Sequence, residues 1–572
     1  MNKPSHRLDT FEFLEVVKAS KHAFYFAALV SLFINLLMLV PPLYMLQLYD
    51  RVLASRSQET LLMLTLIVII MFAVMGILEF VRSRILIRVG NTIDSKISTR
   101  LFNAMFALAN KNPGKSTSQP LGDLTQIRQF LTGIPLFAFF DAPWIPIYIG
   151  IMFLFHVWLG WFTVFAAIVA LALTLVNEKR TKQILESSNR YFQQSQSFIQ
   201  TSLRNSEIIE AMGMHENVRK RWYGRYIAFL NEQSRASDEA GLWSNLSKTV
   251  RMLMQSLVLG LGGYLAIIGE MTPGMMIAGS IIMGRALAPI DLMTSTWKQF
   301  SVARGAYDRL NKLLEEFPAG EKPTPLPDPK GFIDLESVVV FPPEAKDASL
   351  KGVSLSIKAG ETVGVIGPSA AGKSSLARAI LGVWPLYSGN VRIDGAEISH
   401  YDRSVLGGFI GYLPQDIELF DGTITENIAR YEEPKPELVV EAAITAGVHE
   451  MILQLPHGYD TPIGPGGIAL SGGQRQRIGL ARALYGYPKI VVLDEPNSNL
   501  DDAGERALVI AVQEMKKRNI TVLLITHRPS ILGIVDKIAF LHDGQLQMFG
   551  SRDEVMVALA PKSTVTVQGN QA

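Results

Sequence analysis

Six apolar runs in the first 300 residues constrain the fold of this chain more than any other feature of its sequence. A helix that crosses the hydrocarbon core of a bilayer needs about 20 consecutive, mainly apolar residues. A soluble protein can bury one such helix in its core, but six in succession predict an all-α transmembrane domain surrounded by membrane lipid. The runs lie at residues 23–46, 61–80, 134–155, 157–176, 252–269 and 275–297.

The Lys and Arg residues between these runs predict how the helices are oriented. The long connections 81–133 and 177–251 are rich in both residue types, whereas Glu270–Gly274 and the short turn at His156 contain neither. Since Lys and Arg favour the cytoplasmic side of a membrane, both long connections and both termini are expected in the cytoplasm. Apolar residues recur with a helical period in the long connections, so the membrane helices are expected to extend beyond the bilayer.

Composition excludes several classes of function. The chain contains no Cys, which excludes disulfides, thiolate metal sites and a cysteine nucleophile. Its net charge of +2 provides no basic field that would attract nucleic acid. The polar start of the chain shows no small-residue cleavage site after a short apolar core. The first run is therefore interpreted as a retained membrane helix and not as a signal peptide.

Two charged residues lie inside the predicted spans, each beside prolines. Asp141 occurs in FFDAPWIPIY, and Arg285 occurs in IIMGRALAPI. A charge at membrane depth is costly unless it faces water or a partner, so both residues are candidates for lining a translocation path. The alternative is that both lie near the membrane interfaces and only anchor the ends of helices.

The pattern changes after a proline-rich stretch, which cannot continue a helix and is interpreted as a linker. Short apolar strands then alternate with amphipathic helices, which predicts an α/β domain with a parallel core. The predicted organisation is a cytoplasmic segment 1–22, a transmembrane domain 23–314, a linker 315–331, a nucleotide-binding domain 332–555 and a flexible tail 556–572.

A glycine-rich loop follows the short apolar strand ETVGVI and matches the phosphate-binding pattern G-x-x-x-x-G-K-[ST]. Backbone N–H groups of such a loop close around phosphates, and the start of the next helix adds positive potential. Lys373 would reach the β- and γ-phosphates of ATP, and the Ser374 hydroxyl would bind Mg²⁺. The loop consists of Gly367, Pro368, Ser369, Ala370, Ala371, Gly372, Lys373 and Ser374, and Ser375 follows it.

A second apolar strand, IVVL, ends at two adjacent carboxylates. Asp494 suits the coordination shell of magnesium, and Glu495 suits the orienting or deprotonating of an attacking water. An acidic pair at the end of a strand is a weak signal by itself. Together with a phosphate loop, it predicts hydrolysis of a nucleoside triphosphate.

Between these two motifs lies the pentapeptide LSGGQ, followed by the helical pattern RQRIGLARAL. Ser471 can cap this helix, and its hydroxyl with the nearby glycine amides offers a second anion site. LSGGQ between a phosphate loop and LDEP resembles the signature of ABC ATPases, over about residues 330–555. The matching signature residues are Ser471, Gly472, Gly473 and Gln474.

The resemblance implies that Lys373 and Glu495 are catalytic groups. It also implies roles for further residues. Phe341 matches an aromatic residue that stacks on adenine, where tyrosine is commoner. Gln415, in GYLPQD, matches a glutamine that contacts magnesium and couples to the membrane helices. His527, after TVLLIT, matches a catalytic switch histidine that holds the γ-phosphate. Asp501 ends the loop SNLD, which resembles one that crosses the dimer interface, with Asn499 where many relatives have alanine.

Each of these motifs occurs once in the chain. In ABC proteins the signature of one domain completes the site around the phosphate loop of another, so the resemblance implies a half-transporter that works as a homodimer. ATP and Mg²⁺ are the expected cofactors. Segments 120–133 and 203–214 resemble the cytoplasmic loop tips that transmit motion to the membrane helices.

Phrases of the membrane half resemble a narrower group, the type I secretion ATPases. They are LVPPLYMLQLYDRVLASRSQETLLMLT, DAPWIPIYIGIMFLFHVWLGW and GRALAPID, together with DEPNSNLD of the second half. The branch most similar exports proteases, lipases or haem-binding proteins with uncleaved C-terminal signals. This resemblance implies a Gram-negative inner membrane, a secreted protein substrate, a periplasmic adaptor and an outer-membrane channel.

Two alternatives stay open at this point. A lipid or drug exporter of the same architecture would share every ATPase motif. A non-transport ABC ATPase, acting in repair or translation, would be soluble, which the apolar runs disfavour.

Overall fold

The computed structural model describes residue 15 and residues 18–112, 118–318, 325–343, 345–464 and 468–559. The chain divides into two compact units. The first consists of Met1–Met105 with Thr117–Pro318 and is helical, and the second consists of Phe106–Ser116 with Ala319–Ala572 and contains the sheets.

The helical unit confirms the six predicted membrane runs. Among the described residues, six helical stretches are long and apolar enough to cross a membrane. Four of them have 44 to 54 residues, far more than the roughly 20 that a bilayer requires, so these helices continue beyond it. The stretches are Lys21–Ser55, Gln58–Lys111 (α5), Ile134–Phe155, Val157–Arg204 (α9), His215–Ile267 (α11) and Pro273–Glu316 (α12).

Two of the six stretches are interrupted where prolines occur. The first comprises α2 (Lys21–Leu37), α3 (Val40–Gln47), the π-helical turn η1 (Leu48–Val52) and α4 (Leu53–Ser55). The third comprises α7 (Ile134–Asp141), the 3₁₀ turn η3 (Ala142–Trp144) and α8 (Ile145–Phe155). Proline lacks an N–H and clashes with the preceding turn, so it lies at the first positions of α3, η3 and α8.

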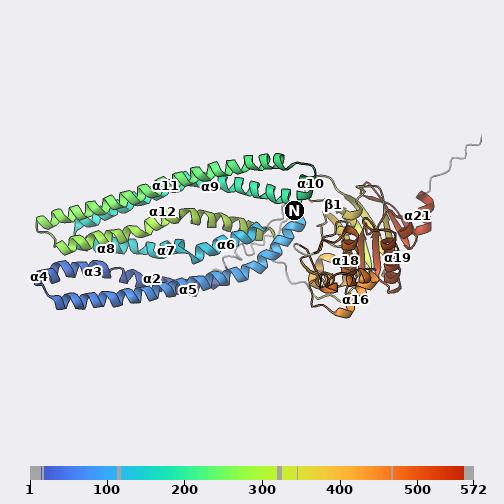
Figure 1. The fold of residues 1–572 in the computed structure, drawn as a ribbon, viewed down its shortest axis with the longest axis horizontal. Coiled ribbons are helices and arrows are strands. Elements are labelled where there is room, and N and C mark those ends of the chain that lie inside the picture. Colours follow the sequence, from blue (N-terminus) through green and yellow to red (C-terminus); the bar gives the residue numbers. More distant parts are fainter. Residues whose placement is uncertain are drawn as a thin grey trace, which may run out of the picture. The chain divides into compact units, whose positions relative to one another are not determined.

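The long helices pack through small side chains. Helices α9 and α11 run along each other, and α12 packs against both of them and against α8 (Figure 1). Ala166 and Ala170 of α9 and Ala278, Gly279 and Ala286 of α12 are buried. Lipid tails are as apolar as the side chains, so association of membrane helices depends on the close approach that small residues allow.

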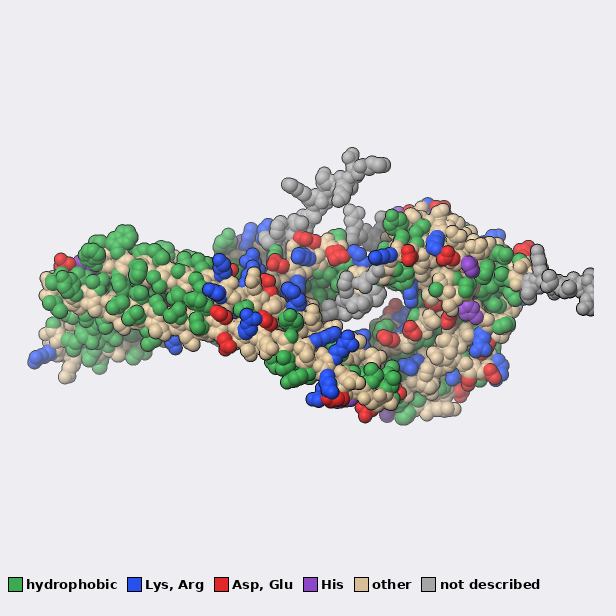
Figure 2. Space-filling view, turned by 90° about the horizontal axis from the view of Figure 1, so that it is seen from above, with side chains coloured by type: hydrophobic (Ala, Val, Ile, Leu, Met, Phe, Trp, Pro, Cys, Tyr) green, Lys and Arg blue, Asp and Glu red, His purple; other side chains and the backbone are tan. Residues whose placement is uncertain are grey.

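Hydrophobic side chains cover one end of the helical unit, and Lys and Arg side chains gather toward its other end (Figure 2). Leu154 and Ile267, for example, are 83% and 86% exposed. An apolar surface of this extent is expected where lipid takes the place of water.

Asp141, one of the two charged residues within the spans, has partners on two other helices. Its Oδ1 accepts a hydrogen bond from Asn35 Nδ2 at 2.8 Å and is 3.4 Å from Arg82 Nη1. The Tyr148 hydroxyl donates in turn to the backbone oxygen of Asn35 at 3.0 Å. Arg285 is half-buried on α12. The role of both residues in a translocation path stays a prediction.

The two predicted loop tips differ in structure. Segment 120–133 lies almost entirely within helix α6 (Gln119–Thr132). This helix packs on α12 through a bidentate salt bridge from Arg309 to Asp123. Segment 203–214 contains the short helix α10 (Ser206–Ala211) at the turn between α9 and α11. That these segments transmit motion stays a prediction.

The second unit confirms the predicted parallel core. A six-stranded sheet has the order β12-β11-β3-β10-β9-β6, in which every neighbouring pair except β12–β11 is parallel. Strands β3, β9 and β10 are buried almost throughout, which explains their unbroken apolar sequences. The bounds are β3 Thr362–Ile366, β6 Ile410–Leu413, β9 Ile490–Asp494, β10 Thr521–Ile525, β11 Lys537–His542 and β12 Gln545–Ser551.

A second, antiparallel sheet was not predicted from the sequence. It has the order β2-β1-β4-β5, and β7 (Gly422–Thr423) and β8 (Pro462–Ile463) form a separate pair. Strands β1 and β2 alternate in burial with irregular register, which leaves a less regular apolar pattern than that of a buried parallel strand. The bounds are β1 Ile333–Val340, β2 Leu350–Ile357, β4 Ser388–Ile393 and β5 Ala396–Glu397.

Helices and short 3₁₀ turns connect these strands. They are α13 (Lys373–Ile380), η4 (Ile398–His400), α14 (Arg403–Phe409), α15 (Ile424–Ile428), α16 (Pro436–Thr445), α17 (His449–Leu453), η5 (Gly458–Asp460), α18 (Gly472–Leu484), α19 (Asp502–Lys517), α20 (Pro529–Leu532) and α21 (Arg552–Leu559).

Three parallel strands end side by side, which positions the candidate site. Ile525 at the end of β10 is paired with Val365 of β3 on one side and with Asp494 of β9 on the other. The segments that leave these strands therefore begin at one edge of the sheet, where ligands bind in open α/β folds.

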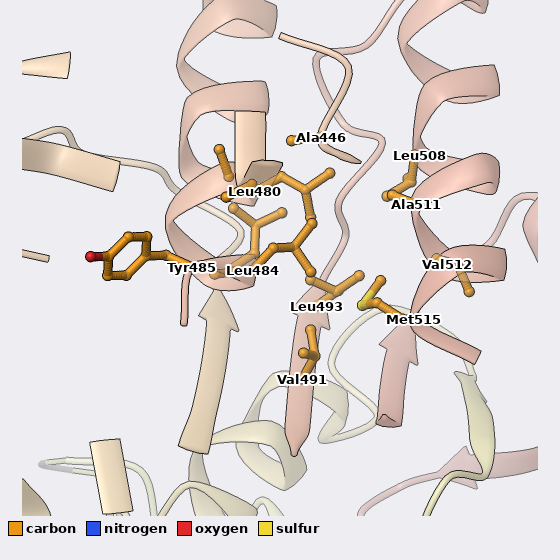
Figure 3. Packing of buried hydrophobic residues seen from close by; sticks show 14 of the residues in the cluster. Ala446, Leu480, Leu484, Tyr485, Val491, Leu493, Leu508, Ala511, Val512 and Met515 are labelled. Atoms are coloured by element: carbon orange, nitrogen blue, oxygen red, sulfur yellow. The ribbon is translucent and has the colours of Figure 1, made fainter. Parts of the chain in front are cut away.

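One apolar core joins β9 to the two helices α18 and α19. Leu480 and Leu484 of α18 and Met515 of α19 point toward Val491 and Leu493 of β9 (Figure 3). This packing holds the second half of α18, the helix that begins within LSGGQ, against the strand that ends at Asp494.

The elements lie close to the predicted domain boundaries. Helix α12 ends at Glu316, β1 begins at Ile333 and α21 ends at Leu559, four residues beyond the predicted end. Most of segment 1–22, part of the linker and residues 560–572 of the tail lie outside the described residues. The domain boundaries stay predictions.

Candidate nucleotide site

The phosphate loop runs from the end of β3 to the second residue of α13, as its sequence predicts. Lys373 curls back over the loop, and its Nζ donates to the backbone oxygens of Gly367 and Pro368, each at 2.9 Å. Burial lowers the pKa of Lys373. Ser369 is exposed, whereas Ala371 and Ser375 are buried.

Glycine is required in this loop for both conformation and space. Gly372 has φ +95°, and a Cβ there would lie 2.4 Å from the backbone oxygen of Ser349. A Cβ at Gly367 would lie 2.2 Å from the oxygen of Leu541. Ala370 also has a positive φ, of 63°. Larger side chains at Gly367 and Gly372 would collide with neighbouring backbone, so the loop can follow this path only with small residues there.

Asp494 is the residue whose surroundings best fit a metal ion. Its side chain is fully buried, and Oδ1 accepts from the Ser374 hydroxyl at 3.2 Å. Oδ2 is also buried and has no hydrogen-bond partner among the residues that the structure describes. Burial raises the pKa of Asp494, partly offset by the bond from Ser374. A buried carboxylate oxygen without a partner is a free ligand, and Mg²⁺ typically takes one or two carboxylates with oxygens of the substrate phosphates.

Glu495 lies between two of the residues that the ABC resemblance singled out. Its Oε2 accepts from Gln415 Nε2 at 3.0 Å, and its Oε1 is 3.9 Å from His527 Nε2. Its φ of +48° places it in the left-handed region, which side chains rarely adopt. The structure therefore brings together Gln415, Glu495 and His527, which are more than 30 residues apart in sequence.

The LSGGQ residues form a complete helix cap at the start of α18. Ser471 Oγ accepts from the N–H of Gln474 at 3.2 Å, and Gln474 Oε1 accepts from the N–H of Ser471 at 2.8 Å. A Cβ at Gly473 would lie 2.8 Å from the backbone oxygen of Asn499. Within the described residues, no hydrogen bond or ion pair joins this cap to the phosphate loop.

The two remaining predicted residues lie elsewhere around the site. Phe341 contacts Tyr387 edge-on, with ring centroids 5.0 Å apart. Tyr387 was not predicted, and no motif marks it, but its exposure of 76% leaves a ring face open beside Phe341. Asp501 caps α19, since its Oδ1 accepts from the N–H of Gly504 at 2.8 Å.

Gln476, the second residue of RQRIGLARAL, was also not predicted. It is buried and hydrogen-bonded to the backbone that follows Glu495. A polar residue at a position where the helix faces the core was the only signal in the sequence.

Two family models match the chain. The ABC transporter model matches residues 350–498, and the model of the ABC transporter transmembrane region matches residues 24–287. The first match covers the phosphate loop, LSGGQ and LDEP, and the second covers the apolar helices.

Curated relatives match the chain over nearly its whole length. The type I secretion system ATP-binding protein PrsD of Rhizobium meliloti is 43% identical over 536 residues, which are 93% of this chain and 92% of that protein. The cyclolysin secretion/processing ATP-binding protein CyaB of Bordetella pertussis is 29% identical over 96% of this chain and 78% of that protein. A leukotoxin translocation ATP-binding protein, LktB of Mannheimia haemolytica, is 28% identical over the same shares.

A solved structure shares the fold. The structure of a bacterial Atm1-family ABC exporter with ATP bound has a TM-score of 0.79 and covers 94% of this chain and 96% of that chain, at 23% identity.

Together the apolar helices and these relatives indicate a multi-pass inner-membrane protein with a cytoplasmic ATP-binding domain, an ATPase coupled to export. The chain therefore belongs to the ABC transporter family, and within it to the ATP-binding exporters of type I secretion systems.

Proposed function

We propose that this chain is one half of a homodimer that hydrolyses ATP to export a protein with a C-terminal signal. The observation that carries the proposal is the 43% identity to a type I secretion ATP-binding protein over 93% of the chain. The partners are a second copy of the chain, a periplasmic adaptor and an outer-membrane channel. Nucleotide-binding and catalytic residues are those that the sequence motifs indicate.

In the proposed reaction, the phosphate loop and Lys373 hold the β- and γ-phosphates. The Glu495 carboxylate orients a water molecule and takes its proton as the water oxygen bonds to the γ-phosphorus. The bond from that phosphorus to the bridging oxygen breaks, and ADP and phosphate leave. Gln415 and His527, which flank Glu495 at 3.0 and 3.9 Å, fix the direction of its side chain.

Three residues would hold magnesium: Ser374, Asp494 and Gln415. When bound, Mg²⁺ would neutralise the charge that develops on the phosphate oxygens. The partnerless Oδ2 of Asp494 supports this assignment.

The homodimer explains why LSGGQ lies apart from the phosphate loop of its own chain. In the described residues the cap of α18 makes no hydrogen bond or ion pair to that loop, so each chain offers two incomplete halves of a site. A two-fold symmetric pair would join the signature of each copy to the phosphate loop of the other.

The test of the ATPase assignment is Glu495→Gln in the full-length protein in lipid nanodiscs. Loss of the carboxylate should lower turnover by roughly 10²–10⁴-fold while ATP still binds, because the phosphate loop is intact. ATP should then hold the two copies together. Glu450→Gln, an exposed glutamate on α17, is the matched control. Turnover in Glu495→Gln equal to that of the control would refute the assignment.

The test of the cargo compares the secreted proteins of cells with and without the gene. One protein should stay inside the deletion strain, and its C-terminal segment should direct a reporter protein out of wild-type cells. A change confined to lipid or drug efflux would instead support the alternative exporter.

A further inference from the structure

A single buried amide binds the backbone that carries the proposed catalytic carboxylate. The Gln476 side chain, 1% exposed, lies in the first turns of α18. Its Nε2 lies 3.4 Å from the backbone oxygen of Glu495, donates to that of Pro496 and lies 3.5 Å from Ser498 Oγ. Its Oε1 accepts from the N–H of Asn499 at 3.0 Å. The segment 495–499 therefore turns around this one side chain.

The conformation of Glu495 needs such support. Its φ of +48° is one that side chains rarely adopt, so the neighbouring structure must hold it there. On the side of the sheet, the N–H of Glu495 donates to the oxygen of Ile525 at 3.0 Å. On the other side, Gln476 is the support, and its position is fixed because α18 packs against β9 (Figure 3).

A second buried side chain ties the same segment to the predicted switch histidine. Thr526, the residue before His527, is fully buried. Its hydroxyl donates to Asn497 Oδ1 at 3.1 Å and accepts from the N–H of Arg528 at 3.2 Å. The segment 495–499 is thus hydrogen-bonded to the signature helix at both ends, through Gln476, and to Thr526 after β10 in its middle, through Asn497.

We propose that Gln476 is a positioning residue that fixes the Glu495 backbone and links it to the signature helix. The dimer part of this inference depends on the proposed function. In the dimer, the signature of each chain would contact the nucleotide of the partner, while Glu495 of that chain acts on its own nucleotide. Gln476 would then connect two parts of one chain, the signature helix at the partner's ATP and Glu495 at the chain's own ATP.

The test is Gln476→Met, which keeps the length of the side chain and removes both the donor and the acceptor. In full-length protein in nanodiscs, kcat should fall at least about tenfold while KM for ATP changes by less than about twofold. Trapping of ADP with vanadate, an analogue of the transition state, should fall by about the same factor as kcat. Gln513→Met, on the exposed face of α19, is the control and should behave as wild type.

A second variant tests the link through Thr526. Thr526→Val removes the hydroxyl that binds Asn497 and should also lower kcat. Because both variants release the same segment, the double variant should lose less activity than the product of the two single losses. Losses that multiply would show that the two side chains act independently and would overturn the link.

Two results would overturn the role of Gln476. One is an unchanged kcat in Gln476→Met. The other is a fall in kcat accompanied by an equal loss of ATP affinity and a lower unfolding temperature, as expected of a merely structural amide. Both results compare the variant with wild type, so they test the role of Gln476 and not the proposed function. The proposed homodimer has its own test, since ATP hydrolysis by a single wild-type copy would refute the homodimer alone.

Discussion

At the scale of single residues, the candidate nucleotide site contains groups whose surroundings do not favour stability. Asp494 is buried, one of its oxygens has no hydrogen-bond partner among the described residues, and burial raises its pKa. A buried charge of this kind destabilises a folded domain unless a ligand compensates for it. Gly372 has a backbone conformation and surroundings that no larger residue fits.

Asp494→Asn should therefore stabilise the protein without nucleotide and divalent cations, by on the order of 1 kcal/mol at neutral pH, and should abolish magnesium-dependent hydrolysis. A raised pKa means that the folded carboxyl binds a proton at a higher pH than the unfolded one does. Above that pKa the wild-type protein should therefore be less stable than Asp494→Asn. The difference in their free energies of unfolding should shrink as the pH falls through the pKa. Thermal unfolding at several pH values measures this, and a less stable variant at neutral pH would contradict it.

Gly372→Ala should weaken ATP binding by at least about tenfold, because the new Cβ would collide with the Ser349 oxygen and open the loop. Gly486→Ala is the matched control, since Gly486 has φ +81° but nothing within 4 Å of its added Cβ. The control should lose only about 1–2 kcal/mol of stability and bind ATP normally. Equal ATP affinity of the two variants, measured by fluorescent nucleotide titration, would show that the clash does not matter.

At the scale of elements, the membrane helices depend on close contacts at particular glycines. Gly160, near the start of α9, faces Phe153 of α8 across the tight turn at His156, and a Cβ there would lie 2.3 Å from the Phe153 ring. Gly150, in the middle of α8, has no described atom within 4 Å of an added Cβ. Alanine substitutions at Gly150 and Gly160 can therefore distinguish the effect of helix propensity on stability from the effect of packing between helices.

Gly150→Ala should leave stability unchanged or raise it by up to about 1 kcal/mol, because alanine favours helices more than glycine does. Gly160→Ala should lower it, because the added methyl displaces Phe153 from α9. The fraction of protein that stays monodisperse in detergent after heating distinguishes them. If Gly160→Ala were as stable as Gly150→Ala, the α8–α9 contact would not be tight.

At the scale of the whole molecule, the proposed homodimer requires the signature of one copy to meet the phosphate loop of the other. The natural absence of Cys makes this directly testable, since any introduced thiols are the only ones present. Ser369 in the phosphate loop and Ser471 in the signature are both exposed.

A chain with both Ser369→Cys and Ser471→Cys should form a disulfide between copies, and should do so best with ATP in the Glu495→Gln background. The product on a non-reducing gel should have the mass of two chains. Ser369→Cys combined with Gln513→Cys should give little of it. A cross-link within single chains would contradict the proposed homodimer.

Local sequence determined much of this protein. Six apolar runs and their lengths predicted the membrane helices, because helix formation in lipid depends on composition over about 20 residues. The phosphate loop, Asp494 and LSGGQ were recognisable because each motif is a short segment whose chemistry is carried by consecutive residues.

The tertiary structure alone decided which distant residues meet. Pairing of β3, β10 and β9 brings Ser374 to Asp494 across 120 residues, and packing of α18 on β9 places Gln476 beneath Glu495. The contact of Asp141 with Arg82 likewise joins separate helices. Such contacts depend on strand order and helix packing, which involve residues far apart in the chain and leave no local periodicity to read.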